Sequence, residues 1–543
     1  MSKSDLEQQE FQGIFWGKQG KSADLKQAQQ RAWFAAFASQ PQEFSYQISE
    51  IEGSIPETLL NSTLFRNGPG LFERGDTRVK HYLDGDGYLC KISFTPEGKA
   101  YFDSKFIRTE EYVQEAVQNS FLYRSAFGMQ KPGGLLANIL DIHLKNPSNT
   151  NIVSWGSKFL SLYEAGIPYL IDPYTLDTIG KGALSNFLSE RTPIDTGVSA
   201  LNSFLNGWKA MTAHPRFDPI QDRMVTWTWH TRVNLGRPNE LVLDIVEYDQ
   251  QWKQKAHTLH SMIGAVVNPH DFALTQSYYI FFENQFEFDF LPYLLGWEGP
   301  ATCLKLKSDK PTLVHLVPRP GGPRAGTEPL VFETIPWFSI HQAFAYDTAD
   351  GGVEIYSTGW PSSGLNGNFL SSWSGYAPNF DNIAPTYLWK TTIDIQRKKI
   401  EHRVAPSTES HCIDHPHINP LRETQDARYI YMSYCNNIGE SSPPTGYMKL
   451  DLKTGDKQYW WNHDLSFTEE LVFVPRSNAI REDDGYLLGM TYDHIHSGRS
   501  SLVIIDASEV AKGPICRLWL NHHVPHGLHG SWSPKYYGSL HQR

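Results

Sequence analysis

The chain has 543 residues, a formal net charge of −11, 42 glycines, 33 prolines and 13% aromatic residues. An acidic chain disfavours a nucleic-acid partner, which would require a basic face. Abundant turn residues and little sustained helical periodicity predict a mainly β protein of short strands joined by tight turns. The five cysteines are widely spaced and form no C-x-x-C pair, which suits a reducing compartment.

The N-terminal segment, residues 1–45, is rich in Gln, Lys and Ala, and we expect a peripheral arm with a helix near residues 22–39. Its first residues are polar, without the apolar run of a secretory signal. No apolar stretch approaches the roughly 20 residues of a membrane helix, so we expect a cytoplasmic protein. Residues 17–22 end like a Walker A loop, but Phe15 occupies the position of the first glycine, which excludes that motif.

From Ile51 onward one unit recurs: an apolar strand, an Asp or Asn turn, and a second strand that alternates with polar residues. The apolar strands fall at 169–173, 241–244, 388–394, 448–455 and 502–506. Their irregular spacing excludes a fixed-period repeat, yet radial repetition is one way for a long β chain to protect its sheet edges. We predict a single β-propeller over residues 46–543. The acidic segment 83–87 lacks the later carboxylates of a calcium loop and is predicted to be a turn.

Two apolar stretches, residues 133–142 and 288–297, do not fit the blades. Burial in the core is one interpretation. The other is an exposed apolar patch at a substrate entrance, which contacts a membrane surface peripherally and collects an apolar ligand.

Four histidines far apart in the chain each lie in a short apolar or aromatic stretch flanked by turn residues: His214, His270, His341 and His529. Any one of the 21 histidines is more often a hydrogen-bonded structural residue than a ligand. If blades around one axis each contribute one of these four, however, they form an all-imidazole metal site.

Other catalytic and metal motifs are weaker. His415 with His417, and His494 with His496, form H-x-H pairs that share a strand face, but both pairs lie beside turns. The H-E-x-x-H and G-x-S-x-G motifs are absent, which disfavours a zinc protease and a serine hydrolase.

Seven further motifs occur in order along the chain: Glu52-Gly53-Ser54-Ile55-Pro56, Phe65-Arg66-Asn67-Gly68-Pro69-Gly70, His81-Tyr82-Leu83-Asp84-Gly85-Asp86-Gly87, Ser104-Lys105-Phe106-Ile107-Arg108-Thr109, Phe473-Val474-Pro475, Glu482-Asp483-Asp484-Gly485 and Leu528-His529-Gly530-Ser531-Trp532. Together they resemble the carotenoid cleavage oxygenase family, and most of all its cyanobacterial-type apocarotenoid oxygenases. The resemblance runs from about Glu43 to Trp532.

This resemblance implies an all-β, seven-bladed β-propeller whose helices and loops form a cap over the iron face. It also implies an iron(II) ion on the propeller axis, held by His214, His270, His341 and His529. Neutral imidazoles leave iron(II) its full charge and keep it electrophilic. The cofactor expected is therefore Fe(2+), with dioxygen as co-substrate.

The resemblance further implies three carboxylates behind the histidines, at Glu164, Asp414 and Glu470, which would fix ring orientation and raise ligand basicity. The family usually has Glu at the position of Asp414, so Glu409 on a shifted loop is the alternative partner of His341. His214 has no matched acid. Thr150 matches a threonine whose methyl crowds one open iron position.

The reaction implied is oxidative cleavage of a conjugated double bond of an apocarotenoid, of the retinal-forming type, to two carbonyl products. Tyr163, Phe344 and Ile340 are candidates for the apolar substrate tunnel, with core packing as the alternative. Ile340 stands where related enzymes often carry an aromatic residue.

Three other functions are considered. Cleavage of a stilbene or phenylpropenoid would need polar groups near the iron to bind a phenol, and alkene isomerisation would proceed without oxygen. A non-catalytic propeller that binds partners belongs to another class, and the matched histidines and acids argue against it.

Overall fold

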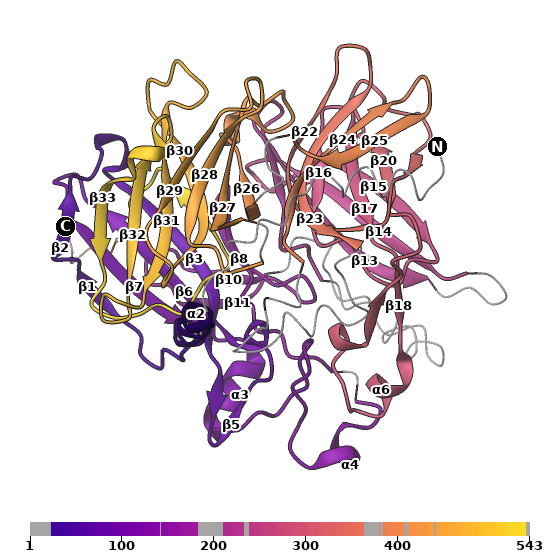
Figure 1. Ribbon diagram of the computed structural model, residues 1–543. Coiled ribbons are helices and arrows are strands. Elements are labelled where there is room, and N and C mark those ends of the chain that lie inside the picture. The colour runs from indigo at the N-terminus through magenta and orange to yellow at the C-terminus, as the bar shows by residue number, and fades with distance from the viewer. Residues whose placement is uncertain are drawn as a thin grey trace.

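The computed structural model describes residues 23–141, 143–182, 210–232, 238–362, 380, 384–406, 411–438 and 441–538. Seven antiparallel sheets of four or five strands are arranged as the blades of a propeller (Figure 1). The predicted seven-bladed, all-β fold is confirmed. The innermost strands of neighbouring blades contact one another around the axis, as β34 does with β8 and β30.

We number the blades I to VII and give the strands of each from the axis outward. Blade I contains β34 (His529–Ser533), β3 (Ser62–Leu71), β6 (Asp86–Phe94), β7 (Ala100–Phe106) and β1 (Ser45–Gln47). Blade II contains β8 (Asn151–Trp155), β9 (Lys158–Leu162), β10 (Tyr169–Ile171) and β11 (Thr178–Lys181). Blade III contains β12 (Arg216–Asp218), β13 (Arg223–Arg232), β14 (Glu240–Tyr248) and β15 (Gln254–Ile263). Blade IV contains β16 (Phe272–Leu274), β17 (Tyr278–Glu283), β20 (Leu313–Pro318) and β21 (Leu330–Glu333).

The remaining blades follow in chain order. Blade V contains β22 (Trp337–Asp347), β23 (Val353–Pro361), β24 (Tyr387–Asp394) and β25 (Lys399–Val404). Blade VI contains β26 (His411–His417), β27 (Tyr429–Ile438), β28 (Gly446–Asp451) and β29 (Lys457–Trp461). Blade VII contains β30 (Ser466–Pro475), β31 (Gly485–Asp493), β32 (Arg499–Asp506), β33 (Pro514–Trp519) and β2 (Glu50–Gly53).

The ring is closed by strands from both ends of the chain. β34 completes blade I by pairing with β3, where His529 lies opposite Asn67. β2 completes blade VII by pairing with β33. Two backbone ladders therefore join the first and last parts of the propeller.

The five apolar strands predicted from the sequence belong to five different blades, II, III, V, VI and VII, and each is the third strand from the axis. The predicted Asp turn after the apolar strand is seen in blade II, where the side chain of Asp172 accepts the backbone N–H groups of Tyr174 and Thr175. In blade III the turn residue is instead Asp249, because β14 continues past Asp244.

The core lies between the blades. Within the described residues each of the seven interfaces between adjacent blades has its own buried apolar cluster. Between blades VII and I, for example, Leu488 and Ile504 belong to the same cluster as Ile92 and Phe102. Alternating strands such as β7 direct every second side chain into such an interface.

Helices and small hairpins cap one side of the ring (Figure 1). The cap elements are α2 (Ala23–Ala36), α3 (Glu110–Gln118), α4 (Gly134–Asn138), α6 (Phe290–Leu294), the hairpin of β4 (Glu73–Arg74) with β5 (Thr77–Arg78), and the hairpin of β18 (Phe286–Phe288) with β19 (Leu304–Leu306). In the described part of the chain, no helix is long and apolar enough to cross a membrane.

The predicted N-terminal helix forms, and the described part of the arm packs against the propeller. Trp33 of α2 and Phe37, which directly follows the helix, pack into a buried cluster with Phe72 and Phe467. These two aromatic residues anchor the helix over the propeller. The predicted domain boundary at residue 45 falls within β1, and it remains a prediction.

Candidate metal centre

Four histidines converge on the propeller axis. His214 and His270 lie just before β12 and β16, His341 lies within β22, and His529 begins β34. The ring centroid of His214 is 4.6 Å from that of His270, 5.4 Å from that of His341 and 4.6 Å from that of His529. The Nε2 atoms of His214 and His270 are 3.1 Å apart. Blades I, III, IV and V thus each contribute one imidazole.

A carboxylate lies behind three of the four rings. The Nδ1 atom of His270 is 2.6 Å from Glu164, that of His341 is 2.8 Å from Asp414, and that of His529 is 3.0 Å from Glu470. Because an ionised carboxylate only accepts hydrogen bonds, each Nδ1 carries the proton. The lone pair of each ring is then on Nε2, which is the arrangement of metal-binding histidines.

The three carboxylates come from the blades that contribute no histidine. Glu164 follows β9 of blade II, Asp414 lies in β26 of blade VI, and Glu470 lies in β30 of blade VII. All seven blades therefore supply a side chain to one centre. His214 has no acid behind it, as expected, and its backbone N–H donates to Thr212 Oγ1 at 3.1 Å.

β-bulges set the direction of several of these side chains. The strand register shifts around Ile340 and His341 in β22, around His415 and Pro416 in β26, and between Thr468 and Leu471 in β30. A bulge places an extra residue on one strand and redirects its side chains. In β30 the bulge lets both Glu469 and Glu470 contact Arg66, which a regular alternating strand would not allow.

The surroundings of Asp414 and Glu470 favour their ionised forms, and those of His214 favour its neutral form. Burial alone would raise the pKa of Asp414, but the charge and hydrogen bond of His341 outweigh it and hold that pKa well below its usual range. The pKa of Glu470 is lowered in the same way by His529 and Arg66 against burial. Burial and repulsion from the other rings hold the pKa of His214 well below its ordinary value.

Arg216 connects three of the ligand segments. Its Nη2 donates to Asp271 Oδ2 at 2.7 Å and to the carbonyl of Gln342 at 2.6 Å, and Nε donates to the carbonyl of Phe272 at 2.8 Å. Asp271 Oδ2 also accepts the backbone N–H of Gln342 at 2.7 Å. These residues follow the ligand histidines directly or by two positions, so the ion pair holds the segments together behind the imidazoles. No sequence motif pointed to this contact.

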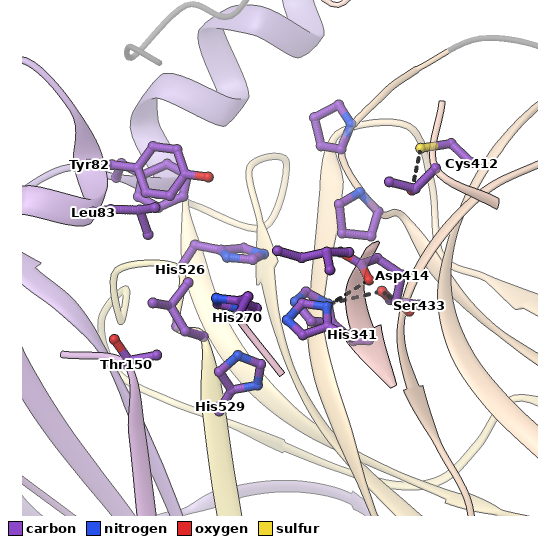
Figure 2. Close-up of a pocket in the computed structure, with 18 of the residues that line it drawn as sticks. Tyr82, Leu83, Thr150, His270, His341, Cys412, Asp414, Ser433, His526 and His529 are labelled. Carbon is purple, nitrogen blue, oxygen red and sulfur yellow. Dashed lines mark hydrogen bonds and ion pairs between the residues drawn. The ribbon is translucent and has the colours of Figure 1, made fainter. Parts of the chain in front are cut away.

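A cavity of about 190 Å³ lies on the cap side of the histidines (Figure 2). Thr150, Tyr163 and Ile340 line it, together with Trp33 of α2 and Phe37, which directly follows that helix. The N-terminal helix is thus part of the cavity wall, which the sequence did not indicate.

Phe344 is not among the described residues that line this cavity. It is fully buried and stacks on Tyr346 and Tyr356, with ring centroids 6.0 Å and 5.1 Å away. The prediction of Phe344 as a tunnel residue is corrected to core packing. The bulge in β22 is the physical reason, because it breaks the alternation that would put Phe344 on the same face as Ile340.

The competing histidine pairs do not act as chelates. The His415 ring is 5.3 Å from that of His341, and its Nδ1 contacts Ser433 Oγ at 3.1 Å. His415 is grouped by distance with His341 and Asp414 rather than with His417. His494 contacts the Tyr492 hydroxyl, and His496 stacks on Trp519.

The acidic segment 83–87 forms a turn, as predicted. The segment 83–87 includes the end of a 3-10 turn, Tyr82–Asp84, and Asp84 accepts the backbone N–H of Phe127. The rejected Walker-like loop and Glu409 lie outside the described residues.

The donor set fits a first-row divalent metal. Within the described residues, ligand atoms of His214, His270 and His341 lie within 4.8 Å of one another. With Nδ1 of His270 protonated, its Nε2 lone pair faces Nε2 of His214. A cation between the rings would accept these lone pairs, and neutral imidazole suits iron, zinc, copper and nickel.

Comparison with known proteins agrees with this geometry. Residues 37–534 match the family model described as RPE65, retinal pigment epithelial membrane protein. The chain is 35% identical over 508 residues to apocarotenoid-15,15'-oxygenase of Synechocystis, covering 92% of this chain and 96% of the relative. It is 26% identical over 466 residues to resveratrol cleavage oxygenase 1 of Botryotinia fuckeliana, covering 83% and 76%.

Solved structures give the same result. The crystal structure of cobalt-substituted Synechocystis ACO aligns with a TM-score of 0.81 at 35% identity, covering 93% of this chain and 98% of that one. The chain therefore belongs to the RPE65 family of carotenoid oxygenases and is an oxygenase built on a seven-bladed propeller.

Proposed function

We propose that this protein is a non-haem iron(II) dioxygenase that cleaves a conjugated double bond of an apocarotenoid to two carbonyl products. The observation that carries the proposal is the convergence of four imidazoles, three of them backed by carboxylates, at the floor of a cavity with aromatic walls. The 35% identity to an apocarotenoid-15,15'-oxygenase supports the substrate class.

His214, His270, His341 and His529 would hold the metal through Nε2. When bound, iron(II) supplies an electrophilic centre at which dioxygen is activated. The carboxylates of Glu164, Asp414 and Glu470 keep the Nδ1 protons in place and the rings oriented. None of these four ligands is a carboxylate. The metal would therefore keep its full +2 charge.

Thr150 limits the space beside the metal. It lines the cavity, and its hydroxyl donates to Asn149 Oδ1 at 3.3 Å. With the hydroxyl engaged, the methyl group is the part left to occupy space beside the histidines. It would leave one position accessible to dioxygen.

The cavity positions the substrate, and no protein acid or base is required for the cleavage. Trp33, Phe37, Phe127 and Trp360 provide an apolar wall that excludes water and holds a rigid polyene. Ile340 lies directly before His341 and also lines the cavity, so it would help to select which double bond lies next to the metal.

Cleavage of a hydroxylated stilbene or phenylpropenoid is a second candidate. The observation that favours it is the presence of polar groups near the histidines: the imidazole of His415, the hydroxyl of Ser433 and the phenol of Tyr163 all line the cavity. Any of these groups would form a hydrogen bond with a phenolic substrate.

An apolar surface beside the cap suits peripheral contact with a membrane. Leu136 and Leu140 near α4 are 90% and 70% exposed, and Leu291 and Trp297 near α6 are 63% and 55% exposed. The two segments meet where the backbone N–H of Leu140 donates to the carbonyl of Leu294 at 2.8 Å, and α4 and α6 project from the same side in Figure 1. Burial in the core is therefore not the role of these side chains. Residue 142 lies outside the described residues.

Metal analysis and product analysis test the enzymatic proposal. Protein purified from iron-replete cells should contain one equivalent of iron, and His341→Ala should lose it. Incubation with a β-apocarotenal and with a hydroxystilbene, followed by identification of the aldehydes, distinguishes the two substrate classes. Metal-free wild type would overturn the proposal.

Flotation with liposomes tests the surface. Leu136→Asp combined with Leu291→Asp should abolish co-flotation while activity on detergent-solubilised substrate is unchanged. Equal flotation of the wild type and the double variant would contradict membrane contact.

A further inference from the structure

A second cavity, of about 200 Å³, lies on the other side of the histidines. The innermost strands pass from one cavity to the other. In β22, Ile340 lines the cap cavity and Gln342 lines the second one. Leu528, just before β34, lines the cap cavity, and Ser531 within β34 lines the second one. His341 and His529 line both cavities. The second cavity, here called the axial chamber, therefore continues the propeller axis beyond the metal centre.

The axial chamber contains polar groups that lack hydrogen-bond partners among the described residues. Oε1 of Glu423 and Oγ of Ser531 form no hydrogen bond with any described residue. No described residue hydrogen-bonds to the ring of His417 either, and all three residues line the chamber. Glu423 is only 7% exposed. Buried polar groups are almost always hydrogen-bonded, so their convergence here indicates water or a polar solute in the chamber.

The charges in the chamber favour a cation. Carboxylates of Asp271, Glu423 and Glu470 line it, against one guanidinium, that of Arg216. Arg216 is paired with Asp271 at 2.7 Å and is 3.9 Å from Glu423. Burial raises the pKa of Glu423 to about 7 although Arg216 opposes the shift, and an approaching cation would favour the ionised form of this carboxyl.

The two cavities differ in what they can admit. A divalent ion arrives hydrated and loses its shell only where oxygen or nitrogen ligands replace the water. The cap cavity also contains such ligands, since Glu164, Asp414, His415 and His526 line it, but much of its wall is formed by aromatic side chains such as Trp33, Phe37 and Phe127. The axial chamber offers the carboxylate of Glu423 and the imidazole of His417. Pro420 also lines the chamber and is exposed to solvent.

We propose that the axial chamber is the route by which a divalent metal ion reaches the four histidines, with Glu423 and His417 as transient ligands. The organic substrate and the metal then enter from opposite sides of the ring. This inference rests on the proposed function, because it requires that the histidines hold a metal.

The test is the rate of cobalt(II) uptake by metal-free protein, followed by the visible absorption of the bound ion in a stopped-flow instrument. Glu423→Gln and His417→Gln should each slow uptake roughly tenfold, because a carboxylate-lined cleft concentrates cations and accelerates their association. The final stoichiometry and spectrum should equal those of wild type. Glu111→Gln is the matched control, since Glu111 is also buried with an unpaired oxygen but lies outside the chamber, and it should bind cobalt at the wild-type rate.

A second arm fills the cap cavity with a β-apocarotenoid under anaerobic conditions, which should leave the uptake rate unchanged. Slower uptake under these conditions, or wild-type rates in both chamber variants, would overturn the proposed route. A changed final spectrum in Glu423→Gln would also overturn it, since Glu423 would then belong to the final site. If Glu423→Gln does not fold, His417→Gln and Ser531→Ala carry the test. Failure of wild type to bind cobalt at all would instead refute the metal centre itself.

Discussion

Replacement of Asp414 by asparagine tests the carboxylate assigned to His341. Oδ1 of Asp414 accepts two hydrogen bonds, from Nδ1 of His341 at 2.8 Å and from Oγ1 of Thr358 at 2.7 Å. Two donors at one atom require that this atom stay an oxygen, so Asp414→Asn should keep the geometry and lose only the charge. Loss of such a partner typically weakens metal binding 10- to 100-fold, or about 1.4–2.7 kcal/mol.

The assay is an anaerobic competition titration of iron(II) against a chromophoric chelator. Asp414→Asn should bind iron within this weaker range, whereas Glu409→Gln should bind it like wild type. Asp414→Glu retains the charge and tests whether the shorter side chain is matched to this backbone. The reasoning is refuted if Glu409→Gln weakens binding and Asp414→Asn does not.

Three further outcomes follow from the geometry. Arg216→Lys should weaken iron binding roughly tenfold, because lysine cannot make the forked contact. Arg319→Lys, at a more deeply buried arginine that pairs with carboxylates at 2.9 Å, should leave iron affinity unchanged. Equal effects of the two substitutions would reduce Arg216 to a general packing role. Trp33→Ala should destabilise the docking of α2 on the propeller by about 3–5 kcal/mol. The expected results are faster proteolysis within α2 and a higher KM. Wild-type values for both would mean that α2 is only peripheral. Finally, acid should destabilise metal-free protein through His214. Its folded pKa is depressed by burial and by the other rings, so the unfolded chain takes up the proton first and stability falls as the pH drops below about 6.5. At pH 5.5 the loss in the free energy of unfolding from this residue is about 1.4 kcal/mol. The free energy of unfolding of His214→Gln, measured by chemical denaturation, should therefore fall less steeply with decreasing pH. A decline equal to that of wild type would contradict this role of His214.

Local patterns predicted strands in five of the seven blades and singled out the four histidines, whereas the family resemblance implied the number of blades and the iron. Apolar runs followed by Asp turns predicted the third strand of five blades. Each blade packs between two neighbouring blades, so a strand within it is apolar on both faces. The histidines were recognised because each interrupts an apolar or aromatic stretch, where an imidazole needs a specific partner. The family motifs then supplied the carboxylates, which no spacing in the chain would have identified.

Other features depend on contacts that sequence periodicity does not encode. The bulge at Ile340 and His341 in β22 inserts residues without any glycine or proline to mark it, so Phe344 was assigned to the wrong face. Trp33 and Phe37 lie in a segment that is otherwise rich in glutamine, and their burial depends on a distant surface of the propeller. The contact of Arg216 with Asp271 joins two blades and likewise has no local signal.

The closure of blade I by β34 has a consequence for biosynthesis. His214, His270 and His341 emerge from the ribosome well before His529, which is carried by the last strand of the ring. A nascent chain can therefore fold its middle blades but cannot complete the set of four imidazoles until β34 pairs with β3. Acquisition of the full metal centre would then report that synthesis and ring closure are finished, and truncated products would remain without oxygen chemistry.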